Sequence, residues 1–189
     1  RLATLVDRLL RWSRAETGQA KLSQDAIDMR ELVDNVVSHL GVLAEEKQQS
    51  VVIEQVGTPR GLGDRLVVRQ SLINLLDNAI KYTPIAGEIR IRVAEGLDTT
   101  TIDVIDNGPG IPPDRRGRIF DRYNREGRAG DIVGTGLGLS ISKWALEMNG
   151  GHLTLEPAET SAETGSTFRI TLPRATRQRV QENRRKSVA

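Results

Sequence analysis

The segment 74–83, Asn-Leu-Leu-Asp-Asn-Ala-Ile-Lys-Tyr-Thr, constrains this chain more than any other. On a helix, Asn74, Asn78 and Lys81 fall at positions i, i+4 and i+7 and share one face. Two carboxamides and an ammonium in line suit an anionic ligand that carries a metal, because amide oxygens are hard donors for Mg²⁺ and an ammonium binds phosphate. A solvated helix edge is the alternative. Apolar residues cover the rest of this helix and would bury it: Leu72, Leu75, Leu76, Ala79 and Ile80.

The pattern around this segment mixes helices with antiparallel strands. Apolar spacing predicts helices over 30–47, 65–82 and 136–148. Asp64 is the expected N-cap of the second helix and Pro84 stops it. Alternation and β-branched residues predict strands, which gives an α+β sandwich with one face of a sheet covered by helices. The expected strands are 26–29, 51–55, 88–94, 99–105, 152–156 and 166–172.

The first part of the chain has the spacing of a helix that packs against a partner. Leu2, Leu5, Leu9 and Trp12 are separated by 3, 4 and 3 residues, and Gly18 would end the helix. No matching helix follows in this sequence. We therefore expect a fragment of a longer protein, whose first helix pairs with an upstream helix or with another subunit.

Composition and charge narrow the function classes. Hydrophobic residues make up 38% of the chain and charged residues 28%, which is typical of globular proteins. The sequence has no long apolar run for a membrane span and no cysteine for a disulfide framework. Residues 174–189 carry a net charge of +5, so the remaining body is −3. We expect a disordered basic tail and no nucleic-acid partner, with a lipid or nucleic-acid contact of the tail as the alternative.

A second motif, Asp106-Asn107-Gly108-Pro109-Gly110, follows the strand expected over 99–105. It places a carboxylate at the mouth of a pocket, and its glycines let the backbone pass close to a ligand. An ionised carboxylate only accepts hydrogen bonds, so it suits the exocyclic amino group of adenine. A turn capped by Asp106 is the alternative.

Two further features lie between this motif and the last expected helix. The segment between Ile111 and Gly134 is long and polar, and a lid over a nucleotide fits it, with Phe120 as its hydrophobic anchor. The sequence Gly134-Thr135-Gly136-Leu137-Gly138-Leu139 then leads into the helix. Backbone N–H groups at such a helix start can bind phosphate. The glycine pattern alone is weak, but three motifs in this order are a strong signal.

Together these residues resemble the catalytic and ATP-binding domain of bacterial sensor histidine kinases, within the superfamily of gyrase, Hsp90, histidine kinases and MutL. The resemblance covers about residues 25–173 and includes boxes at 74–82, 106–110, 119–123 and 134–139. It implies a two-layer sandwich of a mixed five-stranded sheet and three helices. Residues 1–20 resemble the end of the second dimerisation and histidine-phosphotransfer helix, a partial coiled-coil-like helix before the catalytic domain, and residues 174–189 form the tail.

The resemblance also assigns roles to residues. Asn78 is expected to bind Mg²⁺ with Asn74 beside it, Lys81 to bind phosphate, Asp106 to read adenine and Arg125 to reach the γ-phosphate. We expect catalytic roles for Asn74, Lys81 and Arg125. The rest of the implied ATP-binding set is Tyr82, Gly108, Gly110, Ile111, Phe120, Gly134, Thr135, Gly136, Leu137, Gly138 and Leu139.

One position separates the branches of the superfamily. Its ATP-hydrolysing members carry a Glu one turn before the metal-binding Asn, and here that position is Asn74, whose amide cannot take a proton. The domain is therefore expected to hold ATP for an outside nucleophile. His39 and His152 are each followed by leucine rather than by an acidic residue, so neither matches the acceptor box. We expect the acceptor histidine upstream of Arg1.

The sequence thus predicts a protein-histidine kinase domain with ATP and Mg²⁺ as cofactors. It would transfer the γ-phosphoryl group to a histidine outside this fragment, and from there to an aspartate of a response regulator. Expected partners are the protein's own dimerisation helices in a homodimer and a receiver domain. By family habit, the domain would be cytoplasmic and its parent protein anchored in the inner membrane. The alternatives are a degenerate, non-catalytic nucleotide-binding switch and an interaction module that acts through the first helix and the tail.

Overall fold

A computed structural model describes residues 23–121, 137–157, 165–176 and 179. The helix expected over 1–20 and most of the basic tail lie outside these residues. In the described part of the chain, no helix combines the length with the apolar character that crossing a bilayer requires.

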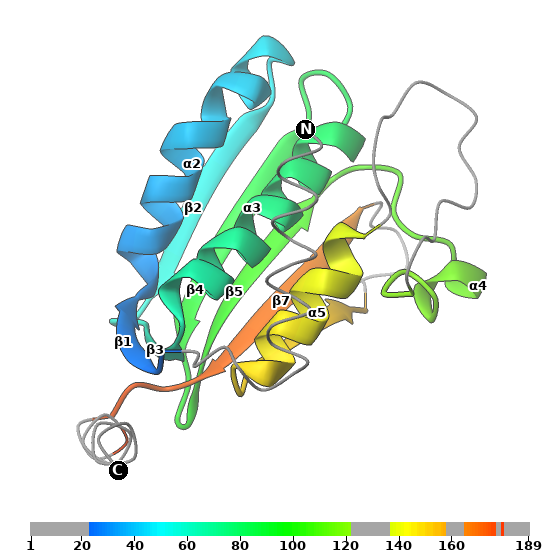
Figure 1. Cartoon of the computed structure of the whole chain (residues 1–189). Helices are drawn as coiled ribbons and strands as arrows, with labels where there is room; N and C mark the ends of the chain where they lie inside the picture. Colours follow the sequence, from blue (N-terminus) through cyan, green and yellow to red (C-terminus); the bar gives the residue numbers. More distant parts are fainter. Residues whose placement is uncertain (1–22, 122–136, 158–164, 177–178, 180–189) are drawn as a thin grey trace, which may run out of the picture.

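The central element is a mixed five-stranded sheet with the order β2-β4-β5-β7-β6 (Figure 1). Strand β2 pairs in parallel with β4, and every other neighbouring pair is antiparallel. This confirms the predicted mixed sheet. The strands are β2 (Ser50–Val56), β4 (Glu88–Glu95), β5 (Thr99–Asp106), β6 (His152–Glu156) and β7 (Ser166–Pro173).

Three long helices lie together on one face of this sheet (Figure 1). They are α2 (Met29–Glu46), α3 (Arg65–Tyr82) and α5 (Gly138–Met148). Asp64 caps α3 as predicted, because its carboxylate accepts hydrogen bonds from the N–H groups of Leu66 and Val67. The two-layer α+β sandwich expected from the sequence is thereby confirmed.

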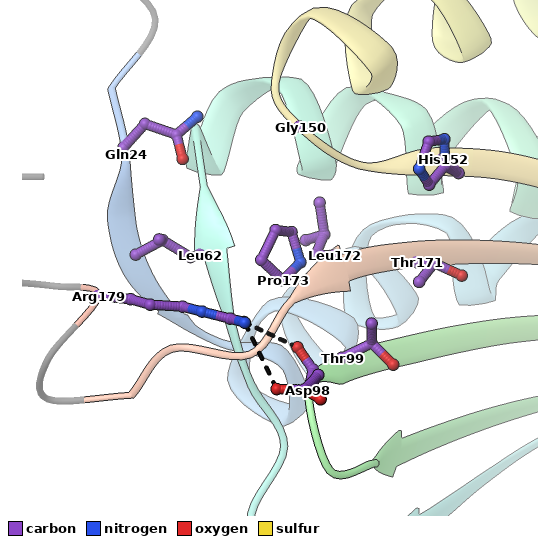
Figure 2. Close-up of a pocket in the computed structure, with 10 residues that line it drawn as sticks. All are labelled: Gln24, Leu62, Asp98, Thr99, Gly150, His152, Thr171, Leu172, Pro173 and Arg179. Atoms are coloured by element: carbon purple, nitrogen blue, oxygen red, sulfur yellow. Dashed lines mark hydrogen bonds and ion pairs between the residues drawn. The ribbon is translucent and has the colours of Figure 1, made fainter.

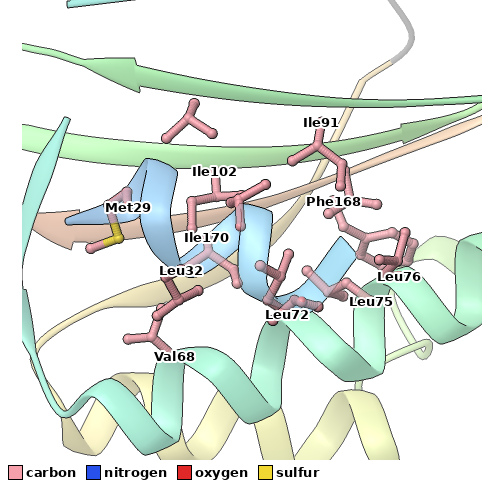
Figure 3. Close-up of a cluster of buried hydrophobic side chains, with 14 of the residues drawn as sticks. Met29, Leu32, Val68, Leu72, Leu75, Leu76, Ile91, Ile102, Phe168 and Ile170 are labelled. Atoms are coloured by element: carbon pink, nitrogen blue, oxygen red, sulfur yellow. The ribbon is translucent and has the colours of Figure 1, made fainter. Parts of the chain in front are cut away.

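The apolar face of α3 forms the centre of the core. Figure 3 shows side chains of α3 directed toward those of the sheet, among them Leu72, Leu75, Ile102 and Ile170. Each of these four side chains is at most 1% exposed. Burial of this face leaves the opposite flank of α3, with Asn74, Asn78 and Lys81, outside the core, as the helical spacing predicts.

Residues from the loop after α2 cap the C-terminal end of α3. The Lys47 ammonium donates to the carbonyl oxygens of Ile80 (2.6 Å) and Lys81 (3.1 Å). The amide nitrogen of Gln49, a buried side chain, donates to the carbonyl oxygens of Ile80 (3.1 Å) and Thr83 (2.7 Å). These bonds satisfy carbonyl groups that every helix end leaves free, and they place a positive charge at the negative end of the helix dipole.

Two short elements were not predicted from the sequence. Strand β3 (Arg60–Gly63) pairs antiparallel with β1 (Asp25–Asp28) to form a separate two-stranded sheet. Helix α4 (Pro113–Arg116) lies inside the segment predicted to be a long loop. Both elements are only four residues long, too short for a period of apolar residues, and the glycines of β3 are more typical of a turn.

Candidate functional site

Helices α3 and α5 run antiparallel, and this arrangement decides what the polar flank of α3 faces. The N–H of Asp64, at the start of α3, donates to Asn149 at the end of α5. Asn74, three turns along α3, contacts Gly138 at the start of α5. Asn78 lies about 6 Å further along the axis of α3, and Lys81 beyond it. Both side chains therefore lie on the part of α3 that extends beyond the N-terminal end of α5.

The Asn74 carboxamide connects the two helices. Its Nδ2 donates to Oγ of Ser142 (2.8 Å) and to the carbonyl oxygen of Gly138 (3.4 Å). Its Oδ1 accepts from Nε2 of Gln70 at 3.4 Å. Ser142 was not singled out from the sequence, because its partner lies 68 residues away along the chain.

Asn78 and Lys81 are half-buried on the same flank. The contacts among described residues give the Asn78 carboxamide no hydrogen bond, so its oxygen keeps its capacity as a ligand donor. The Lys81 ammonium forms an i,i+4 ion pair with Asp77. Both partners are more than a third exposed, so this pair is weak enough for an incoming phosphate to compete with Asp77. Tyr82 ends α3 with its side chain 44% exposed.

Asp106 ends strand β5 and is buried, with 7% of its surface exposed. Its Oδ1 accepts a hydrogen bond from the N–H of Gly108 (2.9 Å). Burial raises the pKa of Asp106 above its usual value, and hydrogen bonds from the backbone of Gly108 and from the backbone and side chain of Ser166 oppose that rise. A carboxylate that is shielded from water in this way is stabilised most by a partner that donates hydrogen bonds to it.

The backbone after Asp106 is packed too tightly for side chains. A Cβ on Gly108 would lie 2.7 Å from Oδ1 of Asp106 and 3.0 Å from the carbonyl oxygen of Tyr82. At Gly165, whose φ is +130°, a Cβ would collide with the carbonyl oxygen of Asp106. Side chains are therefore excluded here by neighbouring protein atoms, and the loop after β5 packs against the last residue of α3. Gly110 has a φ of +71°, which favours glycine.

The described base of the predicted lid is anchored as expected. Ile111 and Phe120 are partly buried against the core. The ring of Phe120 meets that of Phe168 edge-on with centroids 6.4 Å apart, and Nζ of Lys143 lies 4.9 Å from the Phe120 centroid. Residues 122–136 lie outside the described residues, and they include Arg125 and the first half of the glycine motif, Gly134, Thr135 and Gly136.

The N-terminal end of α5 keeps its donors. Leu137 is the N-cap residue, and in the described part of the chain no side chain caps this helix end. Leu137 is buried and Leu139 is partly buried against the core, although the resemblance placed both in the ATP-binding set. Because the first N–H groups of a helix lack internal partners and carry the positive end of the dipole, this end suits a phosphate group.

The donor set fits a magnesium nucleotide. The buried carboxylate is that of Asp106 at the end of β5. The amide oxygen of Asn78 and the ammonium of Lys81 lie on α3, and the N–H groups at the start of α5 have no side-chain cap among the described residues. No group of three His, Cys, Asp or Glu side chains that could hold a metal occurs among the described residues. The amide oxygen of Asn78 is one hard donor on this flank that suits Mg²⁺.

A separate pocket of about 460 Å³ lies at the other end of the sheet (Figure 2). Its lining includes Thr99, which starts β5, whereas Asp106 ends the same strand roughly 23 Å away. Figure 2 shows Arg179 extended toward Asp98, to which it is hydrogen-bonded. None of the residues predicted to bind nucleotide lines this pocket.

A comparison with family models matches residues 63–176 to the family described as histidine kinase-, DNA gyrase B- and HSP90-like ATPase. This range contains Asn74, Asn78, Asp106 and Gly138. The match supports ATP as a ligand of the domain.

Relatives and solved structures agree with this family. The sensor histidine kinase MtrB of Mycobacterium tuberculosis is 36% identical over 181 residues, which cover 92% of this chain and 30% of MtrB. The structure of full-length ShkA in complex with AMPPNP aligns with a TM-score of 0.78 and 28% identity, over 93% of this chain and 36% of ShkA. Histidine kinase ThkA, in complex with response regulator protein TrrA, aligns with a TM-score of 0.71 and 26% identity, over 93% of this chain and 48% of ThkA.

The chain spans about a fifth to a third of the length of the first curated relatives that it matches. The family match covers more than half of the chain and includes the polar flank of α3, the Asp106 motif and the start of α5. The chain therefore belongs to the family of histidine kinase-, DNA gyrase B- and HSP90-like ATPases, and its named relatives include sensor histidine kinases.

Proposed function

We propose that this chain is the catalytic and ATP-binding domain of a sensor histidine kinase. One observation carries the proposal: antiparallel helices α3 and α5 bring an amide-lined flank beside a helix start that no described side chain caps, within a domain of this family. The complex of ShkA with AMPPNP, a triphosphate nucleotide, supports the same ligand class.

Each part of ATP meets a group of suitable chemistry. Asp106 accepts a hydrogen bond from the exocyclic amino group of adenine. Because the carboxylate is buried, this bond is stronger than it would be at the surface. Asn78 offers an amide oxygen to Mg²⁺, and Lys81 neutralises phosphate charge once it leaves Asp77. The N–H groups at the start of α5, with Gly134, Gly136 and Gly138, hold phosphate oxygens. Tyr82, Ile111 and Phe120 line the nucleotide pocket, and Arg125 reaches the γ-phosphate.

The site holds and orients the γ-phosphoryl group but does not activate water. Phosphoryl transfer needs positioning and charge neutralisation more than covalent chemistry from the protein. A base would be required to deprotonate water, and the position next to Asn78 is occupied by the amide of Asn74, which donates its N–H groups to α5. The phosphoryl group therefore passes to an outside nucleophile, a histidine upstream of Arg1.

His39 and His152 are not that acceptor. His39 is an exposed residue of α2 whose Nδ1 lies 2.6 Å from the carbonyl oxygen of Asn35. His152 starts β6 and belongs to the pocket at the far end of the sheet from Asp106. Neither lies on the flank of α3 or at the start of α5.

The proposed function includes the wider organisation of the parent protein. Residues 1–20 end the second dimerisation helix, residues 25–173 form the catalytic domain and residues 174–189 form a tail. The phosphohistidine donates to an aspartate of a response regulator, as the complex of ThkA with TrrA suggests by analogy. The parent protein is a homodimer anchored in the inner membrane, with this domain in the cytoplasm.

The test is a transfer assay with γ-labelled ATP and Mg²⁺. The chain is incubated alone, and in parallel as a longer chain that includes the upstream acceptor helix. We expect acid-labile, base-stable phosphate on the longer chain only, and slow release of inorganic phosphate from both. Acid-labile phosphate on the 189-residue chain alone, or brisk ATP hydrolysis by it, would reject the proposed division of labour.

A further inference from the structure

Lys81, the residue proposed to bind phosphate, lies in the last turn of α3. The helix ends at Tyr82, and Thr83 continues in extended backbone. The carbonyl groups of a last helical turn have no partners within the helix, and such ends fray. Contacts from outside α3 therefore decide how firmly the backbone of Lys81 is held.

Two side chains of the loop after α2 contact this turn, and their contacts differ at Lys81. The ammonium of Lys47 donates to three carbonyl oxygens, those of Ile80 (2.6 Å), Lys81 (3.1 Å) and Thr83 (3.3 Å). The amide nitrogen of Gln49 donates to those of Ile80 (3.1 Å) and Thr83 (2.7 Å) as well. Among the described residues, Lys47 alone donates to the carbonyl oxygen of Lys81.

The base of the Lys47 side chain is also held. Its own N–H donates to the carbonyl oxygen of Ala44 in α2 (3.1 Å), and its carbonyl oxygen accepts from the N–H of Ala86 (3.0 Å). The side chain is half-buried. Because the donor is charged and lies at the negative end of the helix dipole, its hydrogen bonds are stronger than those of a neutral group. Lys47 therefore connects the end of α3 to α2 and to the chain that leads into β4.

The same turn of α3 packs against the motif that carries Asp106. A Cβ on Gly108 would lie only 3.0 Å from the carbonyl oxygen of Tyr82, and the N–H of Gly108 donates to Asp106. The carbonyls before and after that of Tyr82 are the ones that accept from Lys47. The contacts of Lys47 thus place Lys81 relative to the Asp106 motif.

We propose that Lys47 is a positioning residue that holds the backbone of Lys81 where its ammonium meets the phosphate groups of ATP. The inference rests on the proposed function and extends it to a loop outside the family match at 63–176. Without the Lys47 ammonium, the carbonyl of Lys81 loses its donor and the last turn frays. Affinity for ATP then falls, and the loss acts through Lys81.

The test compares Lys47→Met, which removes the ammonium, with Lys47→Arg, which keeps a charged donor. Calorimetry measures affinity for ATP with excess Mg²⁺. We expect Lys47→Met to weaken ATP binding roughly three- to tenfold, and Lys47→Arg to remain within about threefold of the wild type. Unchanged affinity in Lys47→Met, or an equal loss in Lys47→Arg, would overturn the proposal.

Two control variants separate this role from loss of packing or stability. After Gln49→Met, each carbonyl that Gln49 contacted keeps another donor, either Lys47 or, for Pro84, the N–H of Gly87 (3.1 Å). Asn149→Ala removes a hydrogen bond at the opposite end of α3. Both variants should bind ATP within about twofold of the wild type. A loss in either one as large as that in Lys47→Met would contradict the positioning role.

A double-mutant cycle separates positioning from a general effect of charge. Lys47→Met removes a positive charge, which by itself weakens binding of any anion. In a Lys81→Met background, Lys47→Met should have no additional effect on ATP affinity, because Lys47 acts through the Lys81 ammonium. A loss of the same size in both backgrounds would overturn the proposal. Failure of the wild-type chain to bind ATP would instead reject the proposed function.

Discussion

The two ends of the central sheet use polar side chains in different ways. At the end where β5 finishes, Asn78 has no hydrogen bond with the described residues, Lys81 forms only a partly exposed ion pair with Asp77, and no described side chain caps the first turn of α5. At the end where β5 starts, most polar groups are bonded to one another, although the buried Nδ2 of Asn149 has no partner among the described residues. Gln24 donates to Asn149 (2.9 Å), and Arg174 and Arg179 form ion pairs with Glu95 and Asp98.

This difference distinguishes the candidate ligand site, at the end of the sheet where β5 finishes, from a structural junction at the end where β5 starts. The junction lies where β1 leads into the domain and where the chain leaves β7, both beside β3. Its polar groups replace the apolar packing that such short elements cannot provide. The site has the opposite requirement, since a polar group that is already satisfied has little left to offer a ligand. The pocket of Figure 2 belongs to the junction, so the presence of a pocket does not by itself indicate where the nucleotide binds.

Asn78→Ala should have the largest effect, because it removes the amide oxygen that is expected to bind Mg²⁺. We expect Mg-dependent ATP binding to be abolished in calorimetry while the thermal unfolding temperature changes little, since the carboxamide has no hydrogen bond with described residues to lose. Asn35→Ala, at an exposed asparagine on α2, is the control. Unchanged affinity in Asn78→Ala would reject the metal role.

Asp106→Asn should weaken ATP binding by roughly 1.5–3 kcal/mol, the scale of a hydrogen bond to a charged group. The same change should stabilise the ligand-free domain at neutral pH. Because the folded-state pKa of Asp106 is raised, the folded protein binds its proton more tightly than the unfolded chain does. Stability is therefore lost as pH rises from the unfolded pKa through the folded one. The carboxamide of the Asp106→Asn variant does not titrate, so the variant would not suffer that loss.

The measurements for this prediction are urea denaturation at several pH values and calorimetry with ATP. The stability advantage of Asp106→Asn should grow as pH rises through the window between the two pKa values, and vanish below it. Asp98→Asn, on the turn at the other end of β5, is the control, since the Asp98 side chain is 84% exposed. A loss of ATP affinity below a few tenths of a kcal/mol would remove the adenine assignment.

The sequence predicted the site helix best because several independent signals coincide there. For α3, the N-cap Asp64, the apolar spacing and Pro84 all agree, and the helix has the predicted bounds, Arg65–Tyr82. Strand β3 had no such support. It contains one apolar residue, Leu62, between two glycines, and its extended form depends on pairing with β1 and on the bridge to Arg174.

The partners of the site residues could not be predicted from local patterns. The sequence identifies Asn74 and Asp106 as polar groups in unusual places, but it does not show that Ser142 meets the first or that Ser166 meets the second. Such pairs depend on which helix and which strand become neighbours. A polar residue on an otherwise apolar helix face, as Ser142 is, was the one available signal.

At the junction, Asn149→Ala should lower stability rather than affinity. Asn149 is fully buried, and its Oδ1 accepts from Gln24 (2.9 Å) and from the N–H of Asp64 (3.1 Å). Its removal leaves that N–H without a partner, which costs about 1–3 kcal/mol. Urea denaturation measures this loss, and ATP affinity of the folded protein should stay within about twofold. The opposite pattern, intact stability with weakened binding, would show that the junction controls the site.

Arg179→Ala should have the smallest effect. Arg179 pairs with Asp98 at 3.4 Å, and the two side chains are 39% and 84% exposed. A solvated pair of this kind contributes less than about 0.5 kcal/mol, so urea denaturation should barely distinguish the variant from the wild type. The contrast is Arg169→Ala, which would leave the carboxylate of Asp103, only 3% exposed, without its two charge-assisted hydrogen bonds of 2.6 and 2.8 Å. If Arg179→Ala instead destabilised the domain as much as Arg169→Ala, the Arg179–Asp98 pair would contribute to the junction far more than its exposure predicts.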